Sequence, residues 1–310
     1  MQKPGHRIWA ILVLLALLSG ACQKGGVAAR NAGSGTIVVT YSVLGALVKD
    51  LVGDAATVVV AMPNGKDPHE WEPSAQDIAT LNRAALIVQN GLGLEGGMEK
   101  SLQQARAAGV HFFTASDHIR VRKVGLGEGI PTGDPDQALG ADDPHLWLDP
   151  MAMQAGVLAL AAQLKSDLGI DVTGRSQDLA QRLDALDREI AATIATIPEA
   201  NRRLVTGHES MGYFAQRYGL RLVGAIVPSV STQAEVSAAD LAALTKVIQE
   251  NHVKAVFAEV GTSPAVAQTI ARTTGAQVID LPTLVLPADG SYFTFMRELA
   301  GTIAEALKAG

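Results

Sequence analysis

Two histidines of this 310-residue chain occur in the same short pattern, Asp-Pro-His-x-Trp. The first instance contains His69 and the second contains His145. A proline before each histidine restricts the backbone, which lowers the entropy lost when an imidazole is held in one position. A third histidine, His208, follows a β-rich run and a single glycine. Because neutral imidazole is the commonest metal ligand in proteins, these three residues predict a transition-metal site.

The fourth ligand is expected to be a carboxylate, because the only cysteine, Cys22, lies near the N-terminus. Asp280 is the preferred candidate because it ends a predicted strand, although an aspartate that caps a helix or forms a turn gives the same pattern. We expect three glutamates to lie behind the ligands and to orient the imidazoles: Glu70, Glu209 and Glu259. The remaining histidines are not expected to bind metal: His6, His111, His118 and His252.

Two other classes of protein would also hold a metal with such residues. A zinc hydrolase keeps three protein ligands and leaves one position for an activated water, but no His-Glu-x-x-His pair is present. A surface adhesin or scaffold would hold the metal only as part of its structure. Four protein ligands with no bound water would argue against the hydrolase. Reversible metal loading with a stable metal-free fold would argue against the adhesin or scaffold.

The N-terminus carries an export signal. Lys3, His6 and Arg7 precede an apolar run, residues 8–18, that is too short to span a bilayer. The run ends in Leu-Ser-Gly-Ala-Cys at 18–22, which resembles a lipobox, whose cysteine becomes the acylated N-terminus after cleavage. Ser19 departs from the usual lipobox, so a plain cut before Cys22 is the alternative. We expect a signal peptide at 1–21, a tether at 22–35 and an extracytoplasmic protein, periplasmic or on the cell surface, that is lipid-anchored to a bacterial membrane.

Length and charge narrow the class of protein further. A chain of 310 residues is long enough for two lobes, each with its own core. The net charge of -6 becomes more negative when the signal removes Lys3 and Arg7. No arginine- or lysine-rich run supplies a local basic field, so nucleic acid is excluded as a partner.

Short β-rich runs alternate with helical patterns in both halves, which predicts parallel βαβ units and an α/β fold. The predicted N-terminal lobe covers 36–174 and the C-terminal lobe covers 199–310. Between them, residues 175–198 place leucine and isoleucine at helical spacing, which predicts one long helix joining the lobes. An ordinary surface helix is the alternative. The predicted strands are 37–41, 57–62, 85–89, 111–114, 203–206, 221–226, 255–259 and 277–280.

Taken together, several segments resemble the zinc- and manganese-specific solute-binding proteins of ABC importers, the cluster A-I or zinc-uptake family. The segments that carry the resemblance are 63–74, 87–95, 143–150, 206–214 and 256–259. The resemblance implies two α/β lobes joined by a rigid helix, no enzymatic activity, a monomer, and ABC permease subunits as partners. It also implies His69, His145, His208 and Asp280 as the metal ligands, two from each lobe.

The third ligand position bears on the choice of metal. In the resembled family, zinc proteins tend to have histidine there and manganese proteins glutamate, so His208 favours Zn(II) as the transported ion over Mn(II) or iron. Many zinc-uptake relatives carry a histidine-rich loop, which is absent here. Residues 119–144 are instead glycine-rich and acidic. We expect either a loop that recruits ions or a merely solvated insertion.

Overall fold

The computed structural model describes residues 35–125, 128 and 138–308. The predicted signal peptide, Cys22 and nearly all of the predicted tether lie outside these residues. Among the described residues, no helix is both long enough and apolar enough to cross a membrane.

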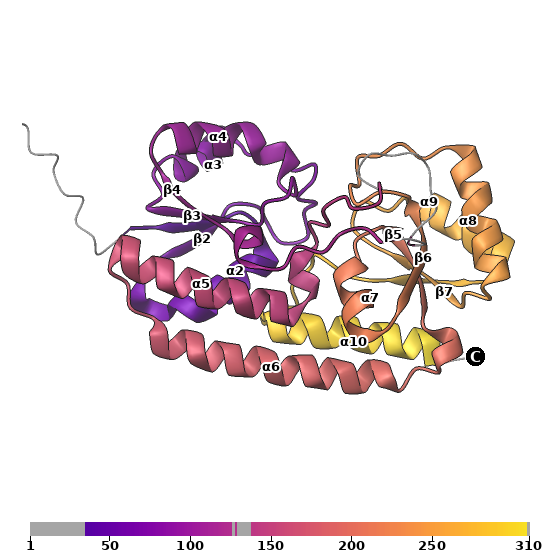
Figure 1. Ribbon diagram of the computed structural model, residues 1–310. Helices are drawn as coiled ribbons and strands as arrows, with labels where there is room; N and C mark the ends of the chain where they lie inside the picture. The colour runs from indigo at the N-terminus through magenta and orange to yellow at the C-terminus, as the bar shows by residue number, and fades with distance from the viewer. Residues whose placement is uncertain (1–34, 126–127, 129–137, 309–310) are drawn as a thin grey trace, which may run out of the picture. The chain divides into compact units, whose positions relative to one another are not determined.

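Two four-stranded parallel sheets are formed, one from each predicted lobe, which confirms the α/β fold class. The first sheet has the order β2-β1-β3-β4 and the second has the order β6-β5-β7-β8 (Figure 1). The first set of strands is β1 (Ile37–Val39), β2 (Val58–Val60), β3 (Leu86–Gln89) and β4 (His111–Thr114). The second is β5 (Arg203–His208), β6 (Arg221–Val227), β7 (Ala255–Ala258) and β8 (Gln277–Asp280). Helices cover both faces of each sheet (Figure 1), which explains why inner strands such as β1 and β3 are almost entirely apolar.

The helices of the first sheet are α2 (Ser42–Val52), α3 (Ala75–Leu81) and α4 (Glu99–Ala107). Those of the second are α7 (Gly212–Tyr218), α8 (Ala238–Glu250), α9 (Pro264–Thr274) and α10 (Tyr292–Lys308). Helix starts follow local chemistry, because Ser74 and Ser237 each form a capping box with the aspartate three residues on. These caps fix where α3 and α8 begin.

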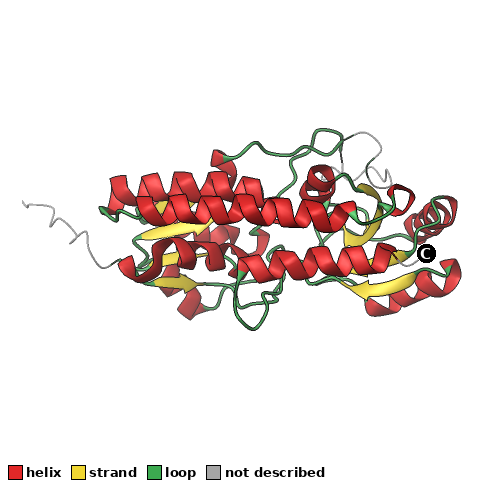
Figure 2. Cartoon of the chain, turned by 90° about the horizontal axis from the view of Figure 1, so that it is seen from below, coloured by secondary structure: helices red, strands yellow, loops and turns green. Residues whose placement is uncertain are grey.

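The long helix expected between the lobes is α6 (Thr173–Ala195), which packs against α5 (Pro150–Leu168) and α10 (Figure 2). Its apolar stripe is fully buried, and each such side chain contributes about 1.5–3 kcal/mol. The stripe consists of Leu179, Leu183, Leu186, Ile190 and Ile194. The sequence analysis did not predict α5. This helix is rich in alanine and also exposes Leu158, so its two faces differ little in polarity.

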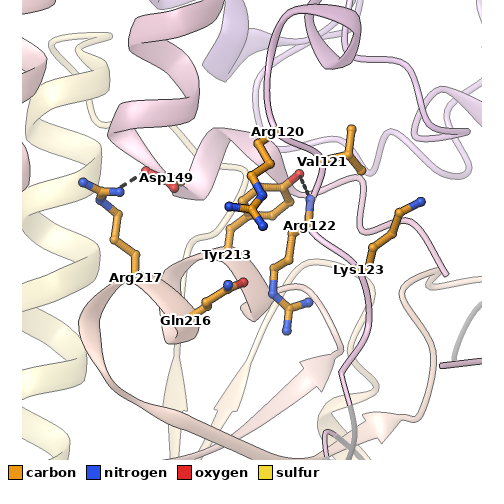
Figure 3. A pocket seen from close by; sticks show the side chains of 8 residues that line it. All are labelled: Arg120, Val121, Arg122, Lys123, Asp149, Tyr213, Gln216 and Arg217. Atoms are coloured by element: carbon orange, nitrogen blue, oxygen red, sulfur yellow. Dashed lines mark hydrogen bonds and ion pairs between the residues drawn. The ribbon is translucent and has the colours of Figure 1, made fainter. Parts of the chain in front are cut away.

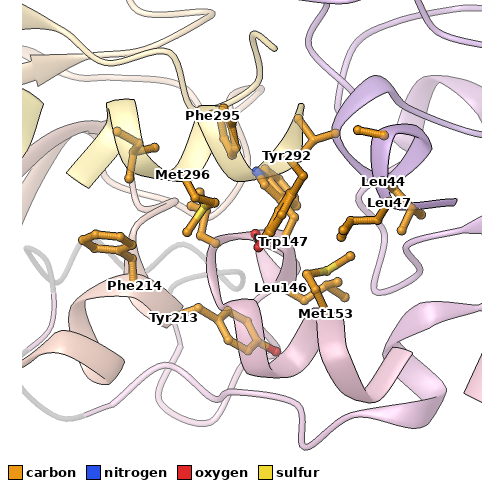
Figure 4. Close-up of a cluster of buried hydrophobic side chains, with 14 of the residues drawn as sticks. Leu44, Leu47, Leu146, Trp147, Met153, Tyr213, Phe214, Tyr292, Phe295 and Met296 are labelled. Atoms are coloured by element: carbon orange, nitrogen blue, oxygen red, sulfur yellow. Dashed lines mark hydrogen bonds between the residues drawn. The ribbon is translucent and has the colours of Figure 1, made fainter. Parts of the chain in front are cut away.

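One apolar core runs from the first sheet to the second. It joins Leu44, Leu47 and Met153 to Tyr292 and Phe295 through the buried indole of Trp147 (Figure 4). Trp147 Nε1 donates to the carbonyl of Thr283 at 2.9 Å, and the Tyr292 hydroxyl donates to the carbonyl of Trp147 at 2.8 Å. The two sheets therefore share a core beside the predicted ligand His145.

Candidate metal centre

His208 ends the central strand β5, and Glu259 directly follows the neighbouring strand β7. The two strands are parallel and paired, so their carboxyl ends lie side by side, where α/β sheets hold ligands. Gly207 allows this approach, because a Cβ there would lie 2.0 Å from Thr262 Oγ1. As a result, His208 Nδ1 lies 2.6 Å from Glu259 Oε2.

His69 and His145 are held by the same local turn. In each Asp-Pro-His segment the aspartate Oδ1 accepts the backbone N–H of the histidine, at 2.9 Å for Asp67 and 3.0 Å for Asp143. Gln233 also donates to the carbonyl of His69 at 2.8 Å. His69 follows β2, whereas His145 follows the segment after β4 and precedes a short 3-10 helix (Leu146–Leu148). Two identical turns therefore present two imidazoles from different parts of the first sheet.

The three histidines converge. Each offers one ring nitrogen, and these nitrogens all lie within 4.8 Å of one another. His145 Nε2 and His208 Nε2 are 3.1 Å apart. A tetrahedral zinc ion bound at its usual distance separates two nitrogen ligands by about 3.3 Å. The three imidazoles are thus spaced as ligands of one small cation.

Neighbouring carboxylates determine where the imidazole protons lie. Asp143 Oδ1 can only accept, so His145 Nδ1 donates to it at 2.8 Å and Nε2 keeps its lone pair. Glu259 favours a proton on His208 Nδ1 in the same way, although the angle of this contact falls outside hydrogen-bond geometry. The two Nε2 atoms then face each other, and a cation between them removes the repulsion of their lone pairs.

Burial and these carboxylates shift the pKa of the three imidazoles in different directions. Burial, reinforced by electrostatic interactions with His145 and His208, lowers the pKa of His69 to about 2. Burial also lowers the pKa of His145, against the opposing effect of Asp143. For His208, burial acts to lower the pKa, but Glu259, Asp67 and Asp143 outweigh it and the pKa is raised. In the metal-free protein a proton on His208 can therefore occupy the position of the cation.

The other predicted site residues lie in different surroundings. Asp280 ends β8 but is exposed, and it is not part of the three-histidine group among the described residues. Glu70 is exposed, Glu209 is buried next to His208, and Glu259 contacts His208. Of the acidic loop at 119–144, Glu128 and Asp143 bind Arg122 and Asp142 binds Lys123, while Asp134 and Asp136 lie outside the described residues.

Four contributing residues were not given a role by the sequence analysis: Asp67, Asp143, Arg122 and Gln233. The two aspartates carried a usable signal, because an aspartate two residues before the histidine is typical of a turn in which its side chain binds the histidine N–H. Arg122 and Gln233 carried none. They lie far from the histidines in sequence and reach the site only through the fold.

Comparison with known proteins agrees with this geometry. Residues 37–306 match the family model described as zinc-uptake complex component A, periplasmic. The high-affinity zinc uptake system protein ZnuA of Bacillus subtilis is 30% identical, over 89% of this chain and 88% of its own length. The manganese ABC transporter substrate-binding lipoprotein PsaA of Streptococcus pneumoniae is 27% identical, over 97% of this chain and 99% of its own.

Among solved structures, the periplasmic zinc-binding protein TroA of Treponema pallidum superposes with a TM-score of 0.74 at 25% identity. The match covers 89% of this chain and 99% of that one. The family model spans nearly the whole part of the chain that the structure describes, including all three converging histidines. The chain therefore belongs to the ZnuA family of solute-binding proteins, which serve metal ABC importers and are not enzymes.

Proposed function

We propose that the protein captures Zn(II) outside the cytoplasm and delivers it to the permease of its importer. The observation that carries the proposal is the convergence of His69, His145 and His208 on one point, with Asp143 and Glu259 facing the Nδ1 atoms of two of them. Capture makes and breaks no covalent bond. The incoming ion takes the place of a proton on His208, so binding releases that proton.

Three nitrogen ligands favour zinc over manganese. Imidazole suits zinc, whereas Mn(II) is a harder ion that prefers carboxylate, carbonyl and water oxygens. The relatives include proteins named for zinc and proteins named for manganese, so the proposal of zinc is supported by the donor set of this chain and not by the relatives. Mn(II) as the transported ion is the alternative.

The fourth ligand in this proposal is Asp280. It ends β8, next to β7 in the sheet that also supplies His208, but its side chain is exposed. Asp280 therefore has to turn toward the histidines when the ion arrives. An Asp280→Ala variant should bind zinc more weakly than the wild type and should show one water or chloride in place of an oxygen ligand by X-ray absorption. Unchanged affinity and an unchanged ligand shell would remove Asp280 from the set.

Cys22 is proposed as the lipid attachment site, which would hold the mature protein at a bacterial membrane. Support comes from the lipoprotein relatives and from the lipobox-like residues at 18–22. Mass spectrometry of the mature N-terminus tests this directly, because an acylated Cys22 and a plain cut before it differ in mass. We also infer that the protein acts as a monomer, since one chain supplies all the proposed ligands.

The main test is metal analysis of protein purified without added metal, followed by competitive titration with zinc and manganese. His208→Ala should weaken zinc binding by orders of magnitude. His111→Ala is the matched control, because His111 is exposed at the start of β4 and should not affect affinity. Near-wild-type affinity in His208→Ala would contradict the site, and tighter binding of manganese than of zinc would contradict the choice of metal.

A further inference from the structure

Asp143 and Arg122 lie behind His145 and connect it to α7, a helix of the second sheet. Asp143 is fully buried, and its two oxygens have different partners. Oδ1 accepts from His145 Nδ1, and Oδ2 accepts from the Arg122 guanidinium at 3.0 Å. Arg122 is itself buried, and the N–H of Asp143 donates to its carbonyl at 3.0 Å. The orientation of His145 therefore depends on a residue 23 positions earlier in the chain.

The first turn of α7 packs against the ion pair formed by Arg122 and Asp143. Tyr213 accepts the backbone N–H of Arg122 at 2.9 Å through its hydroxyl oxygen, a contact drawn in Figure 3. Gly212 lies directly against the pair, because a Cβ at that position would be 2.3 Å from Arg122 Nη1 and 2.4 Å from Asp143 Oδ2. Gly212 is only four residues after His208. The contact thus joins the segment that supports His145 to the segment that carries His208.

A buried arginine–aspartate pair contributes little to the free energy of unfolding compared with apolar side chains in the same place. Removing both charges from water costs several kcal/mol, and apolar residues of similar volume are often as stable or more so. The pair also leaves Arg122 Nε without a hydrogen-bond partner, although that atom is buried. What the pair does provide is a fixed carboxylate behind a metal-facing imidazole, an arrangement that sets ring orientation and tautomer.

We propose that Arg122 is a positioning residue for the metal site. It holds Asp143, which in turn holds His145 with its proton on Nδ1 and its Nε2 lone pair toward the ion. Gly212 is the contact through which α7 keeps that arrangement aligned with His208. This inference rests on the proposed function, because it assumes that His145 binds the captured ion.

Three variants test the arrangement in the full-length mature protein. Arg122→Gln should raise the Kd for zinc about 10–100-fold, which is the usual effect of losing such a supporting contact. Arg122→Lys keeps the charge without the forked geometry and should recover part of the loss. Gly212→Ala keeps every charge but drives a methyl group into the pair, so it should weaken zinc binding to a similar extent as Arg122→Gln.

Two control variants separate this effect from general damage. Arg217→Gln removes a cation from the same cavity, but one that binds Asp149 and Asp187 rather than Asp143. Gly301→Ala adds a methyl group in α10, where nothing lies within 4 Å. Both should bind zinc like the wild type. If Arg122→Gln does not fold, Arg122→Lys and Gly212→Ala decide the question.

The distinguishing measurement is the tautomer of His145, read from the ring ¹⁵N shifts of the metal-free protein. The wild type should show the proton on Nδ1, and Arg122→Gln should show a mixture of tautomers; loss of stability alone would not produce that change. Affinities within threefold of the wild type in Arg122→Gln and Gly212→Ala, or an unchanged tautomer, would overturn the inference. Failure of the proposed function looks different, because then wild type and His208→Ala would bind zinc equally.

Discussion

At the scale of single residues, buried carboxylates lie behind two of the three converging histidines. Asp143 faces His145 and Glu259 faces His208, each from the side away from the point of convergence. Asp67 adds a third negative charge close enough to raise the pKa of His208. Around the three imidazoles, buried carboxylates thus outnumber buried arginines, which Arg122 alone represents among the described residues. This distribution of charge attracts a cation and fixes the nitrogen atoms it meets.

Removing the charge of Glu259 should therefore weaken metal capture. Glu259→Gln keeps the size of the side chain but loses the attraction for a proton on His208 Nδ1, so the Kd for zinc should rise about 10–100-fold in competitive titration. Glu70→Gln is the matched control, since Glu70 adjoins a proposed ligand in sequence but is exposed. Equal effects of the two substitutions would mean that net charge matters and the contact with His208 does not.

The raised pKa of His208 predicts a pH dependence of binding. Below that pKa the ring carries a second proton, which zinc must displace, so affinity falls as pH falls through it. Because the pKa lies above the ordinary value of about 6.5, affinity should still be increasing as the pH rises past that value, and a titration series that extends from about pH 5 into the alkaline range would detect it. His69, with a pKa of about 2, adds no proton competition in that range. A flat profile would contradict this view of His208.

The sequence was informative about these residues only where the signal was local. The repeated Asp-Pro-His-x-Trp pattern indicated His69 and His145, and the β-rich run before His208 indicated that this histidine lies at the end of a strand. The pairing of Glu259 with His208 depends on β5 and β7 being neighbours, although β6 lies between them in sequence. Arg122 reaches the site from a segment with no pattern of its own. Contacts of this kind come from topology, which no spacing along the chain encodes.

At the scale of elements, strands and amphipathic helices were predicted within a few residues, because each carries its own periodicity. The predicted strand at 277–280 coincides with β8, and the predicted helix at 175–198 overlaps α6. The helix α5 was missed, because it is rich in alanine and exposes Leu158, so its two faces differ little in polarity. The proposed lobe boundaries also cut through a shared core, so the linking helix α6 supports one continuous structure rather than separating two independent ones.

The contact between α6 and α7 at Asp187 can be tested by measuring stability at different pH values. Asp187 on this helix binds Arg217 of α7 and accepts from the Tyr218 hydroxyl at 3.0 Å. Burial acts to raise the pKa of Asp187, but Arg217 and Tyr218 outweigh it and the pKa is lowered. A lowered carboxyl pKa contributes stability above the unfolded-state value of about 3.9, and that contribution is lost as pH falls through the folded-state pKa.

Asp187→Asn should therefore lower the free energy of unfolding at neutral pH by about 1 kcal/mol or less, since the pair is partly exposed. The difference from the wild type should shrink once the pH falls below about 4. Urea unfolding at several pH values measures both. Asp184→Asn is the control on the same helix, because Asp184 forms only an exposed pair with Arg188. A deficit that persists unchanged in acid would point to lost packing rather than lost charge.

At the scale of the molecule, contacts that do not involve the metal already connect the two sheets. Asn64 Nδ2 donates to the carbonyl of Leu286 at 3.0 Å, and the N–H of Leu286 donates back to Asn64 Oδ1 at 2.8 Å. Trp147 makes a second connection through Thr283 and Tyr292. These contacts and the shared core use none of the proposed ligands, so we expect the metal-free protein to keep its fold. A scaffold held together by its metal would instead unfold without it.

Metal loading should nevertheless stabilise the whole molecule, because the proposed ligands come from both lobes. At a free zinc concentration of 100 times the Kd, the gain is about 2.7 kcal/mol. For a chain of this size, each kcal/mol raises the Tm by roughly 2–4 °C, so a rise of roughly 5–10 °C is expected in calorimetry. His69→Ala should remain folded and lose this rise. A metal-free wild type that is already unfolded would instead favour a structural metal, and an equal rise in His69→Ala would mean that zinc binds elsewhere.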